Sequence, residues 1–170
     1  MLEYFFSNIL KLLLCFDIMF ENIEVMEMAK MENNKIIYYD TPNGIISSMD
    51  IFNGKLALIG DYFPLSYTNT KKVLESLGMK VIVEETIDGI KDRILKSEQY
   101  DVIFTNNIYR SGTGLQLLQE LKKIKGFNTP IIIHTISREP IQYFLKLGFD
   151  GCLKKPIKQE ETIQVLKVLL

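Results

Sequence analysis

From Lys55 onward, short apolar runs alternate with segments of helical spacing, and this alternation constrains the fold more than any other feature. Each run is continuously apolar rather than alternating in polarity, which is typical of parallel strands buried on both faces. Five such βα repeats predict a parallel sheet that helices cover on both sides. The expected strands are 56–60, 80–84, 102–105, 130–135 and 151–154.

Polar residues follow four of these strands. In a doubly wound sheet, ligands and chemistry collect at the carboxyl ends of the strands. Here the strands end beside Asp61, Asn106, Thr135 and Lys155, so we expect an acid, an amide, a hydroxyl and an ammonium at one edge. The fragment YDVIFTNNIYRSGTG, residues 100–114, places an amide where a carboxylate could have served for chemistry.

Residues 55–170 resemble the receiver domain of two-component response regulators. PIIIHT and GFDGCLKKPI resemble the family's fourth strand and its Lys-Pro turn, and the fragment 100–114 aligns without a gap to its third strand and phosphoacceptor loop. The resemblance implies a flavodoxin-like α/β fold with five parallel strands in the order 2-1-3-4-5. It also implies a cis bond between Lys155 and Pro156.

Members of this family carry a phosphate on an Asp that follows the third strand. Mg²⁺ held by acidic residues, a Thr or Ser and a Lys stabilise the charge of the transferred group. Thr135 and Lys155 match the last two residues. The phosphoacceptor position falls on Asn106, whose carboxamide is a poor nucleophile and a weak, uncharged metal ligand.

Two further parts of the family's switch are altered. A pair of carboxylates is expected after the first strand, but the pair falls on Asp61 and Tyr62 or, shifted by one, on Gly60 and Asp61. Mg²⁺ depends on oxygen ligands of this kind, so we expect binding to be weak or absent, with at most a weak site at Asp61. The usual aromatic switch residue is replaced by Cys152, which is expected to pack in the core.

Cysteine and histidine content excludes other sites. One His and two Cys in the whole chain make a His/Cys metal site untenable, and Cys15 and Cys152 show no pairing pattern. A reducing, cytoplasmic compartment is therefore expected. We expect His134 to be a structural residue of a buried strand. The loop 112–114 lacks the Lys and the spacing of a phosphate-binding motif.

Charge divides the chain near residue 53. Residues 1–53 hold three Lys against eight Asp and Glu, a net charge of -5, whereas 54–170 hold a net charge of +4. We therefore expect an extension over 1–53 and a receiver-like domain over 54–170. Without a basic cluster, nucleic acid is not an expected partner. Residues 35–48 predict a β-hairpin whose turn lies at 41–44.

A helix is expected from the start of the chain to about residue 31. Its apolar residues alternate in steps of four and three, which is typical of a helix that packs on another helix. We expect self-association through residues 5–26, with docking on the receiver-like domain as the second alternative and packing against a partner's helix as the third. The stretch 4–20 contains Lys11 and Asp17 and is not expected to span a membrane. The seam consists of Phe5, Ile9, Leu12, Phe16, Met19, Ile23 and Met26.

These features predict a pseudo-receiver, a phosphorylation-independent and non-enzymatic interaction module in bacterial two-component or phosphorelay signalling. It is expected to bind a histidine kinase or phosphotransfer protein. No output domain is expected after the last helix, so the chain is interpreted as a single protein or the tail remnant of a hybrid histidine kinase. Two alternatives remain at this point. One is an active phosphoacceptor, in which Asp61 is modified or Asn106 deamidates, and the other is a small-molecule binder at the sheet edge.

Overall fold

The computed structural model describes residues 29–32, 35–38, 51–96 and 98–170. The chain forms two compact units, Met1–Ser48 and Met49–Leu170. Within the ranges that the structure describes, none of the helices is both long and apolar enough to cross a membrane. The expected seam at 5–26, the apolar stretch 4–20 and Cys15 lie outside the described residues.

The second unit contains the predicted sheet of five parallel strands in the order β4-β3-β5-β8-β9. The first of the five strands along the chain is second in this order, so the expected order 2-1-3-4-5 is confirmed. Each strand begins and ends within one residue of its predicted bounds. The strands are β3 (Leu56–Gly60), β4 (Lys80–Glu84), β5 (Val102–Asn106), β8 (Ile131–Thr135) and β9 (Gly151–Lys154).

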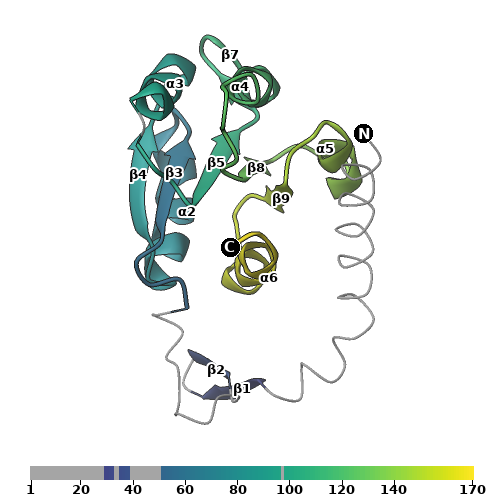
Figure 1. Cartoon of the computed structure of the whole chain (residues 1–170). Helices are drawn as coiled ribbons and strands as arrows, with labels where there is room; N and C mark the ends of the chain where they lie inside the picture. Colours follow the sequence, from purple (N-terminus) through teal and green to yellow (C-terminus); the bar gives the residue numbers. More distant parts are fainter. Residues whose placement is uncertain (1–28, 33–34, 39–50, 97) are drawn as a thin grey trace, which may run out of the picture. The chain divides into compact units, whose positions relative to one another are not determined.

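Helices cover both faces of this sheet. Figure 1 shows α3, α4 and α5 along one face and α2 and α6 along the other. The first face is closed by one apolar cluster, to which all three of its helices contribute buried side chains such as Ile90, Leu117 and Phe144. The helices are α2 (Pro64–Ser76), α3 (Ile87–Leu95), α4 (Gly114–Leu121), α5 (Ile141–Lys146) and α6 (Gln159–Leu169).

Local sequence fixes where the helices begin. Pro64 opens α2, because the ring of proline presets the helical φ and its missing N–H is not needed at the first position. Thr113 caps α4 by accepting a hydrogen bond from the Gln116 amide, while the Gln116 side chain accepts one from the Thr113 amide. The segment 112–114 thus leads into the start of α4.

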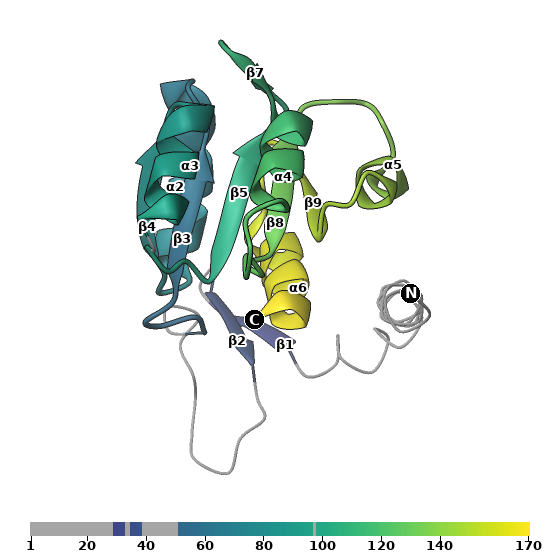
Figure 2. The same cartoon turned by 45° about the horizontal axis from the view of Figure 1, so that its top comes forward.

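A small hairpin lies between β5 and α4. Its strands, β6 (Ile108–Tyr109) and β7 (Gly112–Thr113), pair antiparallel, and β7 projects beyond the carboxyl end of β5 in Figure 2. The sequence prediction treats this segment as a plain loop. Two-residue strands leave no periodic signal, so the hairpin could be found only from the structure.

The first unit corrects two predictions. Residues 29–31, which the periodicity assigns to the end of a helix, lie in β1 (Ala29–Glu32). This strand pairs antiparallel with β2 (Lys35–Tyr38), whereas the sequence prediction pairs β2 across a turn at 41–44. Only two residues, both Asn in the sequence, separate the strands, and tight hairpins favour Asn because it tolerates positive φ. The second β-prone run lies outside the described residues.

The turn that precedes β3 packs within the second unit. Phe52 is buried, and its N–H donates to the carbonyl of Leu77 at 3.0 Å. The expected division between residues 53 and 54 therefore separates Phe52 from residues that it contacts. The structural units divide between 48 and 49.

Truncation of Leu117 to Ala should lower the free energy of unfolding by about 2–5 kcal/mol, because a fully buried leucine leaves a cavity that its neighbours fill only in part. Leu95→Ala is the matched control, since this side chain is 62% exposed, and it should cost at most about 0.5 kcal/mol. Urea denaturation of both variants measures the difference. Equal costs would contradict the described packing of α4.

Candidate functional site

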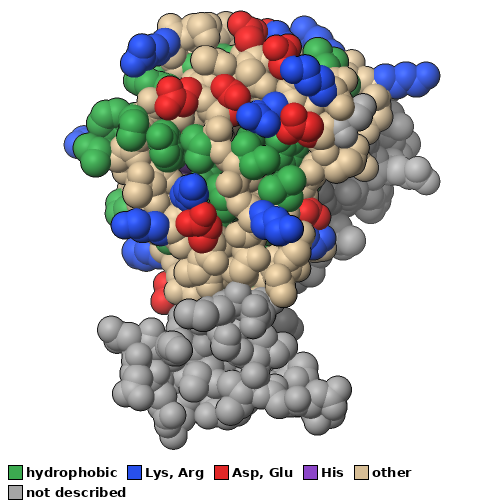
Figure 3. Space-filling view, turned by 90° about the vertical axis from the view of Figure 1, so that its left-hand side faces the viewer, with side chains coloured by type: hydrophobic (Ala, Val, Ile, Leu, Met, Phe, Trp, Pro, Cys, Tyr) green, Lys and Arg blue, Asp and Glu red, His purple; other side chains and the backbone are tan. Residues whose placement is uncertain are grey.

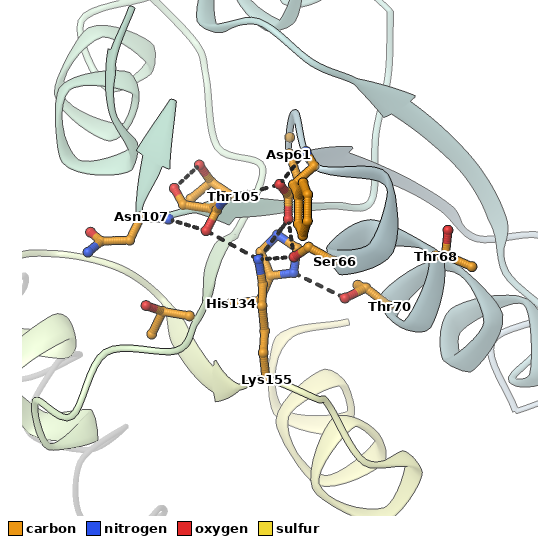
Figure 4. Close-up of polar contacts among 12 residues, drawn as sticks. Asp61, Ser66, Thr68, Thr70, Thr105, Asn107, His134 and Lys155 are labelled. Atoms are coloured by element: carbon orange, nitrogen blue, oxygen red, sulfur yellow. Dashed lines mark hydrogen bonds and ion pairs between the residues drawn. The ribbon is translucent and has the colours of Figure 1, made fainter. Parts of the chain in front are cut away.

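The carboxyl edge of the sheet gathers the polar residues that the sequence singles out. Asp61 follows β3, Asn106 ends β5, Thr135 ends β8 and Lys155 follows β9. Asp61, Asn106 and Lys155 join in one hydrogen-bonded group. Figure 4 shows Lys155 and Ser66 beside the Asp61 carboxylate. The side chain of Thr135 makes no hydrogen bond to this group within the described part of the chain.

The ammonium of Lys155 lies at the centre of the group. It donates to Asp61 Oδ2 at 2.7 Å, to Ser66 Oγ at 2.6 Å and to Asn106 Oδ1 at 3.2 Å. An ammonium has three protons, so these three oxygens account for its whole donor capacity. The side chain of Lys155 is 9% exposed, so little solvent competes for these bonds. The peptide bond between Lys155 and Pro156 is cis, as the resemblance implies.

Asp61 is fully buried and accepts four hydrogen bonds. Its Oδ1 accepts from the Phe63 amide at 3.0 Å and from Asn106 Nδ2 at 3.1 Å, and its Oδ2 accepts from Ser66 and Lys155. Burial alone would raise the pKa of Asp61, but the hydrogen bonds from Lys155, Ser66 and the Phe63 amide hold it below its ordinary value. The carboxylate is therefore ionised and paired at neutral pH.

Burial acts on the partner of this carboxylate as well. It lowers the pKa of Lys155, and the hydrogen bond to Asp61 opposes that change. A buried charge of one sign is stable only beside a charge of the other sign. Asp61 and Lys155 thus form a neutral pair whose members depend on each other.

Asn106 is held on both sides of its amide. Its Nδ2 donates to Asp61, while its Oδ1 accepts from Lys155 and from the backbone N–H of Asn107 at 2.8 Å. These partners define which end of the amide is oxygen and which is nitrogen. A carboxylate at this position would place a second negative charge 3.1 Å from Asp61.

The space beside Gly60 is filled by a tyrosine. The hydroxyl of Tyr109, on the small hairpin, donates to the Gly60 carbonyl at 2.8 Å and shares a hydrogen bond with Thr105. A Cβ added at Gly60 would lie 2.2 Å from that hydroxyl. Burial, and then the charge of Asp61, raise the pKa of Tyr109, so it stays protonated. No acidic side chain fits at residue 60 while Tyr109 keeps this position.

The other candidate for a second acid is Tyr62. Its ring lies under the guanidinium of Arg110, 5.6 Å from the ring centroid, which is a cation–π distance. Both residues are at least partly exposed at the rim of the site. Of the three residues expected to form the acidic pocket, Asp61 alone is a carboxylate that contacts Lys155.

His134 lies beneath the carboxylate. It is fully buried, its Nδ1 shares a hydrogen bond with Thr70 Oγ1 at 3.1 Å, and its Nε2 lies 3.9 Å from Asp61 Oδ2 (Figure 4). Burial and the charge of Lys155 lower the pKa of His134 to about 3, so the ring is neutral at physiological pH. The expectation of a structural histidine agrees with this environment, although Nε2 has no hydrogen-bond partner in the described part of the chain.

The residues at the two switch positions, Thr135 and Cys152, make structural contacts. The Thr135 hydroxyl accepts a hydrogen bond from the Ser137 amide at 3.0 Å. Cys152 is 4% exposed and belongs to the apolar cluster, and burial raises the pKa of its thiol to about 11. The neighbouring ammonium of Lys154 donates to the carbonyls of Ser137 and Glu139 and thereby holds the loop that follows Thr135.

The site does not suit the Mg²⁺ that the fold implies. Mg²⁺ binds through oxygen ligands, usually including carboxylates, whereas both oxygens of Asp61 already accept hydrogen bonds. The described residues include no cluster of three or more His, Cys, Asp or Glu that could hold a metal ion. What the arrangement does chemically is neutralise one carboxylate with one ammonium.

Sequence reasoning missed Ser66 and Tyr109. Ser66 bonds to both members of the ion pair, and its signal was Pro64, which fixes the start of α2 and so places the third helical residue beside the strand end. Tyr109 carried no comparable signal, because its contact with Gly60 depends on the small hairpin.

A doubly wound sheet with Asp61, Asn106, Thr135 and Lys155 at the carboxyl ends of its strands defines a receiver-type signalling module. The chain belongs to the family described as response regulator receiver domain, whose sequence profile matches residues 57–167. The receiver prediction is confirmed, and with it the assignment to two-component signalling.

Two relatives show where such domains occur. The transcriptional regulatory protein CpxR homolog of Haemophilus influenzae is 29% identical over 118 residues, covering 68% of this chain and 50% of that protein. The osmosensing histidine protein kinase SLN1 of Saccharomyces cerevisiae is 26% identical over 95 residues, covering 55% of this chain and 8% of the kinase. The chain thus spans half of one relative and a small part of the other.

Solved structures agree with the fold. A two-component response regulator from Clostridium difficile is 28% identical, with a TM-score of 0.57 and coverage of 68% of this chain and 94% of that one. The receiver domain of the Francisella response regulator 1452 is also 28% identical, with a TM-score of 0.56 and coverage of 69% and 96%. Both alignments cover nearly all of the matched chain.

Replacing Asp61 by Asn should lower the free energy of unfolding at pH 7 by about 3–5 kcal/mol, because Lys155 would remain as an unpaired buried charge. The pKa of Asp61 is lowered on folding, so its stabilisation is full above the ordinary value of 3.8 and is lost as pH falls through the lower folded pKa. Urea titrations of both proteins should therefore converge at acid pH. Glu85→Gln, at an exposed position, should change little at any pH.

Proposed function

We propose that this receiver is a pseudo-receiver, a protein-interaction module of two-component or phosphorelay signalling that works without taking up phosphate. It catalyses no reaction of its own. The observation that carries the proposal is the position of the Lys155 ammonium. Its three protons are bound by Asp61, Ser66 and Asn106, so the charge that would meet a phosphate is already neutralised inside the protein.

The residue at the phosphoacceptor position supports the same proposal. Phosphoryl transfer requires a nucleophile and cations that stabilise the transferred charge. Asn106 offers a carboxamide, whose two ends are both engaged in hydrogen bonds. Asp61, the other candidate acceptor, is fully buried and has both oxygens occupied, so the geometry does not favour its modification.

The switch elements favour one fixed conformation. Thr135 bonds to the amide of Ser137 in its own loop, and Lys154 holds two carbonyls of that loop. Cys152 is packed in the core and has no ring that could rotate between two positions. We infer that the module presents a constant surface to its partners.

The partner that the family favours is a histidine kinase or a phosphotransfer protein, and a cytoplasmic location follows from that role. The likeness to part of a histidine protein kinase supports a place in such a relay. Figure 3 shows acidic and basic side chains interspersed with hydrophobic ones on the side of β4, rather than a basic patch. That face offers no basic stripe that could follow a nucleic-acid backbone.

Incubation of the full chain with Mg²⁺ and a small phosphodonor such as acetyl phosphate should leave its intact mass unchanged. Lys155 has no free proton for the phosphate, and Asn106 is no nucleophile. A stoichiometric adduct that survives acid and is lost in base would sink the proposal. A phosphorylatable receiver treated in the same tube shows that the donor is active.

Asn106→Asp should gain at most weak phosphorylation, since a second metal carboxylate is still missing. Adding Tyr62→Asp should increase the yield, because this partly exposed side chain leaves room for an acid at the rim. Intact mass after a fixed time compares the single and double variants, with Tyr67→Asp as the second change in a control pair. Full activity of the single variant would show that the metal side of the site is intact.

A further inference from the structure

A pocket lies between α4, α5 and the loop that precedes α5, away from the Asp61–Lys155 pair. Its volume is about 200 Å³. Apolar side chains line much of it, and two aromatic rings among them, Phe144 and Phe149, pack edge to face at 6.4 Å. Leu115 of α4 and Leu147 contribute aliphatic walls. The pocket therefore has aromatic and aliphatic walls on one side, and polar residues complete its lining: Asn107, Thr113, Ser137 and Glu139.

Three exposed apolar side chains lie at or beside the pocket. Tyr143, which also lines it, is 45% exposed, Ile141 on the same helix is 43% exposed, and Ile136 in the adjoining loop is 85% exposed. Exposed apolar side chains that cluster beside a pocket mark interaction sites more often than isolated ones do. This group offers more contact area than the pocket alone.

The rim of the pocket is bonded to the candidate site. Asn107, which lines the pocket, donates its backbone N–H to Asn106 Oδ1, and Ser137, on the opposite rim, donates its own to Thr135 Oγ1. Two loops thus run from the site to the pocket. An occupant of the pocket would contact the loop that Asn106 holds on one side and the loop that Thr135 and Lys154 hold on the other.

The charge around the pocket is mainly positive. Arg138 and Lys146 adjoin lining residues and are exposed. Lys122 donates to the carbonyl of Gly148, and Lys154 donates to loop carbonyls and lies 5.2 Å above the ring of Phe144. These four cations form no ion pair within the ranges that the structure describes. They outnumber the two acids beside them, Glu139, which lines the pocket itself, and Asp150.

We propose that this pocket receives one apolar side chain, aromatic or leucine, from an acidic segment of a partner protein. The proposal rests on the interaction role argued above and adds the place and the chemistry of the contact. A pocket of this volume is smaller than the roughly 300–1,000 Å³ typical of sites for drug-sized ligands, and it suits a single anchor side chain. The cations that form no ion pair favour acidic residues on either side of that anchor in the partner segment.

Three capped peptides serve as probes of the full-length, ¹⁵N-labelled chain: Glu-Glu-Phe-Glu-Glu, Glu-Glu-Ala-Glu-Glu and Lys-Lys-Phe-Lys-Lys. Backbone amide shifts follow each titration. The acidic peptide with Phe should shift the amides of Leu115, Ser137, Leu147 and Phe149. Loss of either the anchor or the acidic flanks should weaken binding by roughly tenfold or more.

Two variants test the pocket itself. Leu115→Phe should fill it and abolish the shifts, whereas Leu95→Phe, on an exposed face of α3, should leave them unchanged. Arg138→Glu with Lys146→Glu should weaken binding of the acidic peptide roughly three- to tenfold. Lys72→Glu with Lys80→Glu makes the same change of net charge elsewhere and should have no effect. Unaltered spectra away from the substitution show that each variant is folded.

Three outcomes would overturn the proposal. Equal binding of the three peptides would show that neither the apolar side chain nor the acidic residues matter for binding. Shifts that map to another surface would show that the peptide binds somewhere other than the pocket. Shifts of the pocket amides with protein concentration alone would make a second copy of the chain the occupant. The phosphodonor experiment fails or succeeds independently, so a phosphorylated chain that still binds the acidic peptide would refute the pseudo-receiver and leave the pocket assignment standing.

Discussion

One buried ion pair organises the carboxyl edge of this receiver. Asp61 follows β3, the second strand in the sheet order, and Lys155 follows β9, the last. Their 2.7 Å contact therefore joins the ends of two strands that are not neighbours in the sheet. Neither charge is stable in the interior without the other, and Ser66 and Asn106 satisfy what remains of their hydrogen-bonding capacity. The need to pair these two buried charges therefore fixes the strand ends, the start of α2 and the turn before α6.

Replacement of a charge by an amide is consistent with this requirement. With a carboxylate at residue 106, two negative charges would face one ammonium in a buried site, and a metal ion would be needed to balance them. Asn106 removes the excess charge and keeps the shape, since its amide donates to Asp61 and accepts from Lys155. Asn107, which lines the pocket beside α5, donates its backbone N–H to Asn106, so the pocket and the site share this loop.

The sequence allowed the sheet to be predicted because continuously apolar strands and turn residues are local signals. Asp61, Asn106 and Lys155 were predicted to meet, since the strand order brings their strand ends together. What escaped prediction is two tight hairpins, whose strands are too short or too ambiguous to read from the pattern of residues. The small hairpin that carries Tyr109 has strands of two residues, and the pairing of Lys35–Tyr38 with the segment before it competed with an equally plausible turn after it.

The tyrosine that fills the space beside Gly60 has an evolutionary consequence. An acid at residue 60 collides with the Tyr109 hydroxyl, and loss of that hydroxyl leaves the Gly60 carbonyl and Thr105 without a partner. A Cβ at residue 60 would also lie 2.6 Å from Ile90 Cδ1, so loss of the tyrosine alone does not open the space. Introducing a second acid through residue 60 therefore requires coordinated changes in three segments of the chain, each of which is unfavourable by itself.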